Sequence, residues 1–375
     1  MAASLLEPHE AAFCEEVRDW CRQVAPRASA TQYYEGRGGL TRELYRELGA
    51  RGWLSLTWPL RSGGSGLPVS YDFLLWDELA YWRLARPDLG PGIVAHLLVE
   101  HGTPAQQARL LPGIASGEDC YCLGYSEPGA GSDLAGLQTR ARRDGDSYVV
   151  AGEKCWTSDA HHARFILLLA RSGAPDSRGR GLSLFVCPTD AAGITISPIP
   201  TMDGHRLNQV HFDDVCLPLE ARIGAEHGAW RMIRAALAVE RHLQLLPGRP
   251  RRDLEDLVSA CDRLGILDDR AVSGRVAPLV TGVLEAESSA LSTVRLLVAG
   301  ADASLQAARS RLLGSRLVQD ISRTAVELLG DEALVRGQIF ELLWRQTIME
   351  TIAGGTSEIL EGMIARQALG LGGTP

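Results

Sequence analysis

The spacing of hydrophobic residues divides the chain into three segments. From residue 7 to about residue 117, apolar side chains recur every three or four positions, as Phe13, Val17 and Trp20 do. This spacing places them on one face of a helix, and successive faces of this kind predict helices that pack together. We therefore expect residues 1–118 to form an α-helical N-terminal domain.

The second segment, residues 119–220, carries short apolar or alternating runs separated by turn residues such as Asp144-Gly145-Asp146. Runs of this length, bounded by turns, are typical of β-strands. We expect strands at Ser147–Ala151, Arg164–Ala170, Leu182–Cys187, Ile194–Ile199 and Val210–Phe212. Together they predict a compact antiparallel β domain between two helical blocks.

In the third segment, residues 221–375, helical spacing returns and continues from Ala229 to Gly370. The segment is long enough for four or five helices, which predicts a C-terminal α-helical bundle. The fold class expected for the whole chain is α+β, with the β domain in the middle.

Composition narrows the class of protein without identifying it. The chain has 375 residues, enough for two or three structural units, and its formal net charge of −8 argues against general binding to nucleic acid. The longest apolar run, Phe165 to Ala170, is too short to cross a membrane. The N-terminus lacks the features of a signal or transit peptide, and the eight cysteines are scattered. We therefore expect a cytoplasmic protein with reduced thiols, without disulfides or a structural metal.

Two peptides carry chemistry that the hydrophobic pattern does not explain. The first runs from Ser126 to Asp133 and reads SEPGAGSD, and the second runs from Gly152 to Ser158 and reads GEKCWTS. Glycines and a proline in the first peptide set a backbone that can approach a ligand closely, with hydroxyl groups on either side. The second peptide adds an aromatic face and further hydroxyls. This combination suits a planar cofactor that bears phosphates.

In their order and spacing, these peptides resemble the flavin-contacting segments of the acyl-CoA dehydrogenase family. Two more stretches resemble signatures of that family: Phe212 to Pro218 (FDDVCLP), at the exit from the β domain, and Gly354 to Ile359 (GGTSEI), near the C-terminus. The resemblance spans nearly the whole chain. It implies an acyl-CoA dehydrogenase-like fold, FAD as the cofactor, and α,β-dehydrogenation of an acyl thioester.

The resemblance assigns cofactor contacts to Leu123, Ser126, Gly131, Ser132, Trp156 and Ser158. It implies that Ser126 bonds the pyrimidine end of the flavin, and that Ser132 meets both the cofactor and the thioester substrate. Trp156 matches the tryptophan that shields one face of the ring, and Ser158 matches a hydroxyl near N5, the hydride acceptor. If the resemblance is set aside, residues 126–133 read as an ordinary Pro-Gly turn between strands, and Trp156 reads as an aromatic residue of the hydrophobic core.

The C-terminal signature supplies the other contacts that the resemblance implies. Thr356, Ser357 and Glu358 match positions beside the ribityl and phosphate groups of the cofactor. Gly355 matches a backbone N–H that points at the thioester carbonyl of the substrate. Such a donor stabilises the enolate oxygen, on which the acidity of the α-carbon depends.

Two parts of the cofactor site depart from the family pattern. Arg263 matches an arginine that reaches the FAD pyrophosphate from a neighbouring subunit, but the Phe-Gly pair that normally follows is missing. A Gly-Gly turn that cradles the adenosine is reduced to LGDE at residues 329–332. In these respects the chain resembles a bacterial subgroup that includes heteromeric enzymes, in which two different chains share the cofactor sites.

The usual catalytic base is absent. In much of the family a glutamate immediately precedes the Gly-Thr pair near the C-terminus, and this chain has Gly354 there. Another branch carries the base on a helix of the C-terminal bundle beside an arginine, and the matching pair is Glu240-Arg241. The resemblance implies that Glu240 removes the α-proton and that Arg241 lies beside the substrate; the alternative is an ordinary surface pair. The rival carboxylates are Glu350, Glu358 and Glu361.

Three functions remain open from the sequence. The first is an FAD-dependent dehydrogenase, with Glu240 as base, that acts on an acyl group carried by coenzyme A or a carrier protein. Its electrons would pass to an electron-transfer flavoprotein or a similar acceptor. The second is a non-catalytic or half-site subunit of a heteromeric acyl-CoA dehydrogenase, and the third is a related flavin oxidase or monooxygenase. We expect a homo- or heteromeric dimer or tetramer, and assign no role to His161 and His162.

Overall fold

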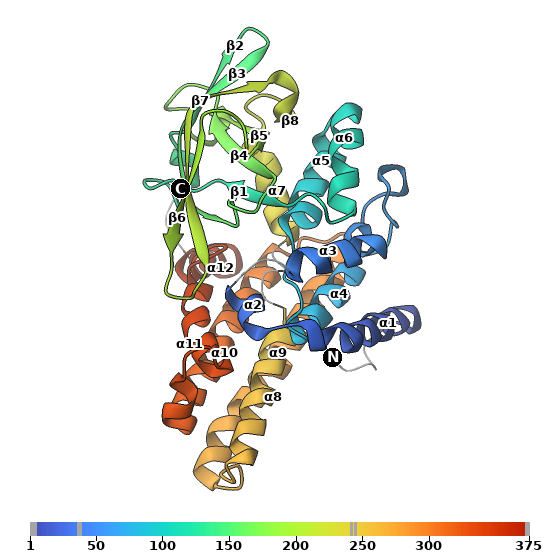
Figure 1. The fold of residues 1–375 in the computed structure, drawn as a ribbon, viewed down its shortest axis with the longest axis vertical. Coiled ribbons are helices and arrows are strands. Elements are labelled where there is room, and N and C mark those ends of the chain that lie inside the picture. Colours follow the sequence, from blue (N-terminus) through green and yellow to red (C-terminus); the bar gives the residue numbers. More distant parts are fainter. Residues whose placement is uncertain (1–5, 36–39, 241–242, 244–245, 372–375) are drawn as a thin grey trace.

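The computed structural model describes residues 6–35, 40–240, 243 and 246–371 of the chain. Helices from both ends of the sequence form one body, and a β-sheet from the middle of the sequence lies at one end of it (Figure 1). This arrangement confirms the expected α+β fold, with helical segments on either side of a β domain. The domain boundaries at residues 118 and 220 stay a prediction.

Six α-helices lie in the described residues that precede the sheet. They are α1 (Pro8–Val24), α2 (Ala30–Glu35), α3 (Leu40–Ala50), α4 (Val69–Tyr81), α5 (Ala95–His101) and α6 (Pro104–Ala115). A π-helical turn, η5 (Gly90–Val94), leads directly into α5.

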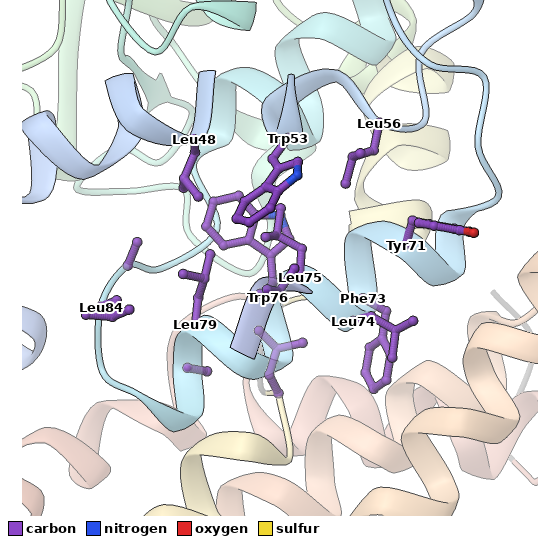
Figure 2. Close-up of a cluster of buried hydrophobic side chains, with 14 of the residues drawn as sticks. Leu48, Trp53, Leu56, Tyr71, Phe73, Leu74, Leu75, Trp76, Leu79 and Leu84 are labelled. Atoms are coloured by element: carbon purple, nitrogen blue, oxygen red, sulfur yellow. The ribbon is translucent and has the colours of Figure 1, made fainter. Parts of the chain in front are cut away.

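Helix α4 is central because it is buried on almost every side. Residues 73–80 are all buried, as expected for a helix with apolar side chains around its whole circumference. It packs against α1 and against two helices from the end of the chain, α8 and α9. Figure 2 shows its side chains in one apolar cluster with Leu48 and Trp53. Leu243 and Leu291 belong to the same cluster, so the N- and C-terminal helices share a core.

The middle of the chain folds into an eight-stranded sheet. Its strands are β1 (Tyr121–Gly124), β2 (Arg140–Asp144), β3 (Ser147–Ser158), β4 (Phe165–Arg171), β5 (Leu182–Pro188), β6 (Ile194–Pro200), β7 (Arg206–Pro218) and β8 (Arg222–Ile223). Their order is β6-β7-β3-β2-β4-β5-β8, with β1 beside β4.

Most neighbouring strands are antiparallel, as expected, and parallel pairing occurs only at β4 among the described strands. Strand β1 pairs with β4 in parallel, with Tyr121 opposite Phe165, and Arg140 of β2 forms a parallel bridge to Arg171. Strand β1 follows α6 and does not form a hairpin with β4, and only a tight hairpin turn would force the two strands to run antiparallel.

Six α-helices also lie in the described residues that follow the sheet, where we expected four or five. They are α7 (Ala229–Glu240), α8 (Gly248–Arg263), α9 (Arg270–Val298), α10 (Ser304–Leu329), α11 (Ile339–Thr347) and α12 (Ser357–Leu369). The long helices α8, α9 and α10 pack together, and α11 and α12 both pack against α10. The turn between α8 and α9 lies at the end of the molecule away from the sheet (Figure 1).

All eight cysteines are free thiols, and six of them are buried. Of the helices in the described ranges, none has both the length and the apolarity needed to span a lipid bilayer.

Candidate functional site

The two peptides singled out by sequence, residues 126–133 and 152–158, are joined by a buried ion pair. Nζ of Lys154 lies 2.8 Å from Oε1 of Glu127 and donates to the carbonyl of Tyr125 at 3.0 Å. The side chain of Lys154 is fully buried and that of Glu127 is nearly so. The ammonium group therefore ties the second peptide to both sides of Ser126 in the first.

The carboxylate of Glu127 is fully engaged. Besides the ammonium of Lys154 it accepts the backbone N–H groups of Gln138 at 2.6 Å and Thr139 at 2.9 Å. Burial alone would raise the pKa of Glu127, but Lys154 and these N–H groups outweigh burial, and the pKa is lowered. Burial lowers the pKa of Lys154 to about 8, although Glu127 opposes the shift. Both groups are therefore predominantly charged at neutral pH.

A backbone contact beside this pair aligns the expected flavin contacts. The N–H of Cys155 donates to the carbonyl of Ser126 at 2.9 Å. Leu123 lies half-buried in β1 against an apolar cluster, whereas Gly131 and Ser132 are exposed in the loop that follows. The first peptide thus follows a fixed strand and ends in a loop that is open to a ligand.

Trp156 is not a core residue. Its side chain is 57% exposed, and its backbone has a φ of +59°, in the left-handed region that costs an L-residue roughly 1–2 kcal/mol. The strain accompanies a bulge, because the register between β3 and β7 shifts between Lys154 and Thr157. Strained backbone that presents an exposed aromatic ring is typical of a binding site, and this ring is available to stack on a planar ligand.

A buried amide supports the next residues of β3. The carbonyl of Thr157, one residue before Ser158, accepts a hydrogen bond from Nδ2 of Asn208 at 2.9 Å. Asn208 is fully buried in β7, and its Oδ1 accepts from Nε of Arg206 at 3.1 Å. Its Nδ2 also lies 3.2 Å from Nδ1 of His161. The backbone direction at Ser158, which ends β3, is therefore set by side chains from β7 and from the following loop.

A hollow of about 570 Å³ adjoins the end of β3. Its lining comes from α2, the loop after β3, the facing ends of β6 and β7 and the turn between these two strands: Glu35, Asp159, His161, His162, Pro198, Pro200, Thr201, Gly204, His205 and Arg206. Burial, with His162 and Arg206, lowers the pKa of His161 to about 4, so this ring is neutral at pH 7. Across the described parts of the chain, no group of three or more His, Cys, Asp or Glu side chains is arranged to hold a metal ion.

The loop before α12 has an unusual backbone. Gly354 has a φ of +69° and Gly355 a φ of +103°, conformations that glycine adopts readily and other residues rarely do. Thr356 caps α12, and its hydroxyl accepts the N–H of Ile359 at 3.3 Å. Ser357 begins the helix and is half-buried. The start of a helix presents N–H groups and a positive dipole end, which favour phosphates.

Helix α7 ends at Glu240, the expected base. This helix packs against β5, α5 and the π-helical turn η5. The side chain of Glu240 and the whole of Arg241 lie outside the described residues, so both assignments stay predictions.

The three rival carboxylates are engaged or exposed. Glu350 is buried between Arg249 and Arg311; burial alone would raise its pKa, but the two guanidinium groups outweigh burial and lower the pKa to about 2. A carboxylate of that acidity is a poor base at neutral pH. Glu361 forms an exposed ion pair with α10, and Glu358 is exposed in the first turn of α12.

Arg263, the expected cross-subunit contact, is the last residue of α8 and is exposed. The turn that follows α8 lies at the end of the molecule opposite the sheet (Figure 1). The fold therefore does not bring Arg263 to the Trp156 region of its own chain. A role at a cofactor would need the site of a second subunit, and this assignment stays a prediction.

The residues that support the site were not predicted from the motifs. Glu127 and Lys154 lie inside the two peptides without an expected role, and Asn208 lies outside every motif. A signal was present: Lys154 lies on the inward face of β3, and Asn208 shares the inward face of β7 with Val210 and Phe212. A lysine or asparagine at a position that the strand alternation buries needs a specific partner.

The donor set fits the flavin that the resemblance implies. An exposed aromatic ring, hydroxyls at Ser126 and Ser158, an open glycine loop and the start of a helix are the parts needed to hold a planar ring with a phosphate tail. Each of them is available on the surface of this chain, and Glu127, Lys154 and Asn208 behind them are already paired.

Comparison with known families gives three matches that together span most of the chain. Residues 7–118 match the N-terminal domain of acyl-CoA dehydrogenases, residues 122–215 the middle domain and residues 228–369 the C-terminal domain.

Individual relatives match over nearly their full length. The chain is similar to acyl-CoA dehydrogenase FadE26 of Mycobacterium tuberculosis, with 32% identity covering 92% of this chain and 91% of the relative. It is 33% identical to acyl-CoA dehydrogenase IpdE1 of the same organism, covering 96% and 97%. Among solved structures, the Tcur3481-Tcur3483 steroid ACAD superposes with a TM-score of 0.92, at 31% identity over 99% of this chain and 100% of that chain. The ChsE4-ChsE5 complex from Mycobacterium tuberculosis gives a TM-score of 0.89, at 28% identity over 98% and 99%.

Proposed function

Because the chain belongs to the acyl-CoA dehydrogenase family, we propose that it binds FAD and oxidises an acyl thioester at its α and β carbons, with Glu240 as the base. It is an oxidoreductase that acts on CH–CH bonds, as the members of this family are. The observation that most directly supports FAD binding is the exposed side chain and strained backbone of Trp156. The buried pair Glu127–Lys154 holds this residue beside Ser126.

The chain's own residues hold and orient the cofactor. When bound, FAD accepts the hydride that leaves the β-carbon of the substrate. The ring of Trp156 would stack on the flavin, and the hydroxyls of Ser126 and Ser158 would donate to it. Thr356 and Ser357 lie at the start of α12 and would hold the ribityl and phosphate groups, because the helix dipole there favours negative charge.

Other residues bind and deprotonate the substrate. Ser132 and the N–H of Gly355 bind the thioester, and that N–H stabilises the oxygen that becomes negative as the α-proton leaves. Glu240 takes this proton, and Arg241 lies beside the substrate. The absence of a side chain at Gly354 leaves room for a carboxylate that arrives from α7.

The experiment is anaerobic mixing of the purified protein with acyl thioesters while the flavin absorbance is followed. We expect Glu240→Gln to retain its FAD and to reduce it at least about a hundredfold more slowly than the wild type, since a positioned base contributes about 10²–10⁴-fold. Glu361→Gln, an exposed glutamate of α12, is the matched control and should keep the wild-type rate. A Glu240→Gln protein that reduces its flavin at the wild-type rate would show that another group is the base.

The names of the similar proteins guide the choice of acyl thioesters for this experiment. One similar structure is named as a steroid ACAD, so we propose that a thioester of a steroid side chain is oxidised in preference to straight-chain acyl groups. Each acyl group is offered both as the coenzyme A thioester and on a carrier protein. The ranking of flavin reduction rates across this panel identifies the acyl group and the handle.

A second proposal is that the chain is one subunit of a heteromeric dehydrogenase. The names of two of the similar structures each pair two different chains. In addition, residues 330–332, where the adenosine-binding turn of the family is shortened, are exposed in this chain. The protein purified alone would then contain little FAD and would gain it when co-expressed with a related chain. Stoichiometric FAD in a catalytically active homo-oligomer would eliminate this proposal.

A further inference from the structure

Glu350, a buried carboxylate that the proposed reaction does not use, lies just before the loop that carries Gly355. It belongs to the 3-10 turn η11 (Ile348–Thr351). Nη1 of Arg249, in α8, donates to its Oε1, and Nη1 of Arg311, in α10, donates to its Oε2 at 3.0 Å. All three side chains are less than a tenth exposed. Both oxygens of the carboxylate are thus held by buried cations from two different helices.

Arg311 also holds the backbone of this loop. Its Nη2 donates to the carbonyl of Glu350 at 2.9 Å and to the carbonyl of Ala353 at 3.2 Å. Ala353 immediately precedes Gly354 and Gly355, both of which have positive φ. Two consecutive glycines have many accessible conformations, so the loop needs an external tether to keep one of them. The guanidinium of Arg311 supplies that tether at the last carbonyl before the glycines.

The same cluster reaches the N-terminal helices. The guanidinium of Arg249 lies 5.2 Å from the ring centroid of Tyr34, in α2. The hydroxyl of Tyr34 donates to Asp253 at 2.8 Å, and Nη1 of Arg83 pairs with Asp256 at 2.6 Å in the same group. The tether of the loop therefore rests on both helical parts of the molecule and does not depend on α10 alone.

We propose that Arg311 and Glu350 are positioning residues that fix the direction of the Gly355 N–H. The inference rests on the proposed function, in which this N–H binds the thioester carbonyl. A buried ion pair contributes little net stability compared with a well-packed apolar pair, so stability alone does not account for three charges here. Their effect on the position of the loop accounts for them, because a hydrogen-bond donor stabilises a developing oxyanion only when it points at that oxygen.

The test begins with hydrogen exchange of the amides of residues 350–358, measured by mass spectrometry, in Arg311→Gln and Glu350→Gln. We expect exchange in this segment to rise about tenfold or more in both, because local opening becomes easier once the tether is removed. Arg311→Lys keeps the charge and should restore part of the protection. The matched control is Arg316→Gln, also in α10, whose partner Glu361 is exposed, and it should leave the loop unchanged.

Flavin reduction separates this inference from the proposed function. With a thioester that reduces the wild type, Arg311→Gln should lower the limiting rate about tenfold or more, as removal of an oxyanion donor does, while FAD content and substrate affinity change little. Loss of one partner of a buried ion pair lowers the melting temperature in either case, but a merely structural role would leave the limiting rate of the flavin-bound protein unchanged. Unchanged exchange of the loop in both variants overturns the positioning role. A wild type that no thioester reduces defeats the proposed function, and the exchange result still decides whether the tether exists.

Discussion

The ammonium of Lys154 and the carboxylate of Glu127 lie 2.8 Å apart, both buried, on the two separate peptides that carry the expected flavin contacts. Removal of one partner from such a pair is more costly than removal of both, because the remaining charge is left without compensation. The relationship explains how two peptides about twenty residues apart in sequence present their hydroxyls and their aromatic ring at a fixed spacing.

Glu127→Gln should therefore lower the free energy of unfolding by about 3–5 kcal/mol. The double variant Glu127→Gln with Lys154→Met should recover part of this loss, because no buried charge remains. Urea denaturation measures both. The control is Asp133→Asn in the same loop, whose ion pair with Arg178 is exposed and contributes at most about 1 kcal/mol. Equal, small losses in Glu127→Gln and Asp133→Asn would contradict the structural role of the buried pair.

Trp156→Ala should separate ligand binding from stability. The side chain is 57% exposed, so its removal should change the free energy of unfolding of the flavin-free protein by less than about 1 kcal/mol. Its stacking on the flavin is lost, and the dissociation constant for FAD should rise about tenfold or more, since an aromatic stack contributes about 1 kcal/mol beyond the burial of its area. Flavin fluorescence titration and thermal melts provide the two measurements.

The contrasting tryptophan is Trp58, which is 1% exposed in the core. Trp58→Ala should cost about 3–5 kcal/mol, as truncation of a buried aromatic does. If Trp156→Ala were as destabilising as Trp58→Ala and left FAD binding unchanged, Trp156 would be a structural residue and its assignment to the cofactor would be wrong.

The architecture could be read from the sequence because hydrophobic spacing reflects burial directly. The apolar run at Leu182–Cys187 becomes β5, which is buried along almost its whole length. Strand β2 was not anticipated because it reads RARRD and buries only Ala141. Its position depends on pairing with β3, a tertiary contact that leaves no mark on local composition.

The site was only partly accessible from the sequence, for a similar reason. The motifs located Trp156 and Ser126, but not the bulge that gives Trp156 its positive φ, because register depends on the partner strand. Glu350 could be considered only as a distant rival for the base. Its partners Arg249 and Arg311 come from α8 and α10, so no sequence neighbour reveals that its charge is already engaged.

Asp77 should make stability depend on pH. This carboxylate is 2% exposed in α4 and accepts the N–H of Gly248, the first residue of α8, at 2.6 Å. Burial raises its pKa from 3.8 to about 6, although Arg251 and that N–H oppose the shift and Glu78 adds to it. A raised pKa means that the folded state binds the proton more tightly. The contribution of this group to stability is therefore complete below pH 3.8 and is lost as the pH rises through 6.

Asp77→Asn keeps an acceptor for Gly248 and does not titrate. Its free energy of unfolding, relative to the wild type, should therefore rise by on the order of 2 kcal/mol between about pH 4 and pH 6.5. Urea denaturation at several pH values gives this difference, and other titrating groups cancel in it. Asp19→Asn, an exposed member of an α1 ion pair, should show no such trend. A difference that stays flat across this pH range in Asp77→Asn would rule out the raised pKa.

Substitution of Gly354 tests directly which position supplies the catalytic base. The proposed function requires that a carboxylate from α7 replaces the glutamate that other family members carry at this position. In a Glu240→Gln background, Gly354→Glu should therefore restore flavin reduction by about tenfold or more, because a general base is returned to the substrate. The φ of +69° at Gly354 makes any side chain there cost roughly 1 kcal/mol or more, so the rescue should be incomplete.

Gly354→Gln in the same background imposes the same strain and size without a base, and should restore nothing. If Gln and Glu at position 354 gave equal rates, the recovered activity would come from repacking of the loop and not from proton abstraction, and the assignment of Glu240 would lose its strongest support.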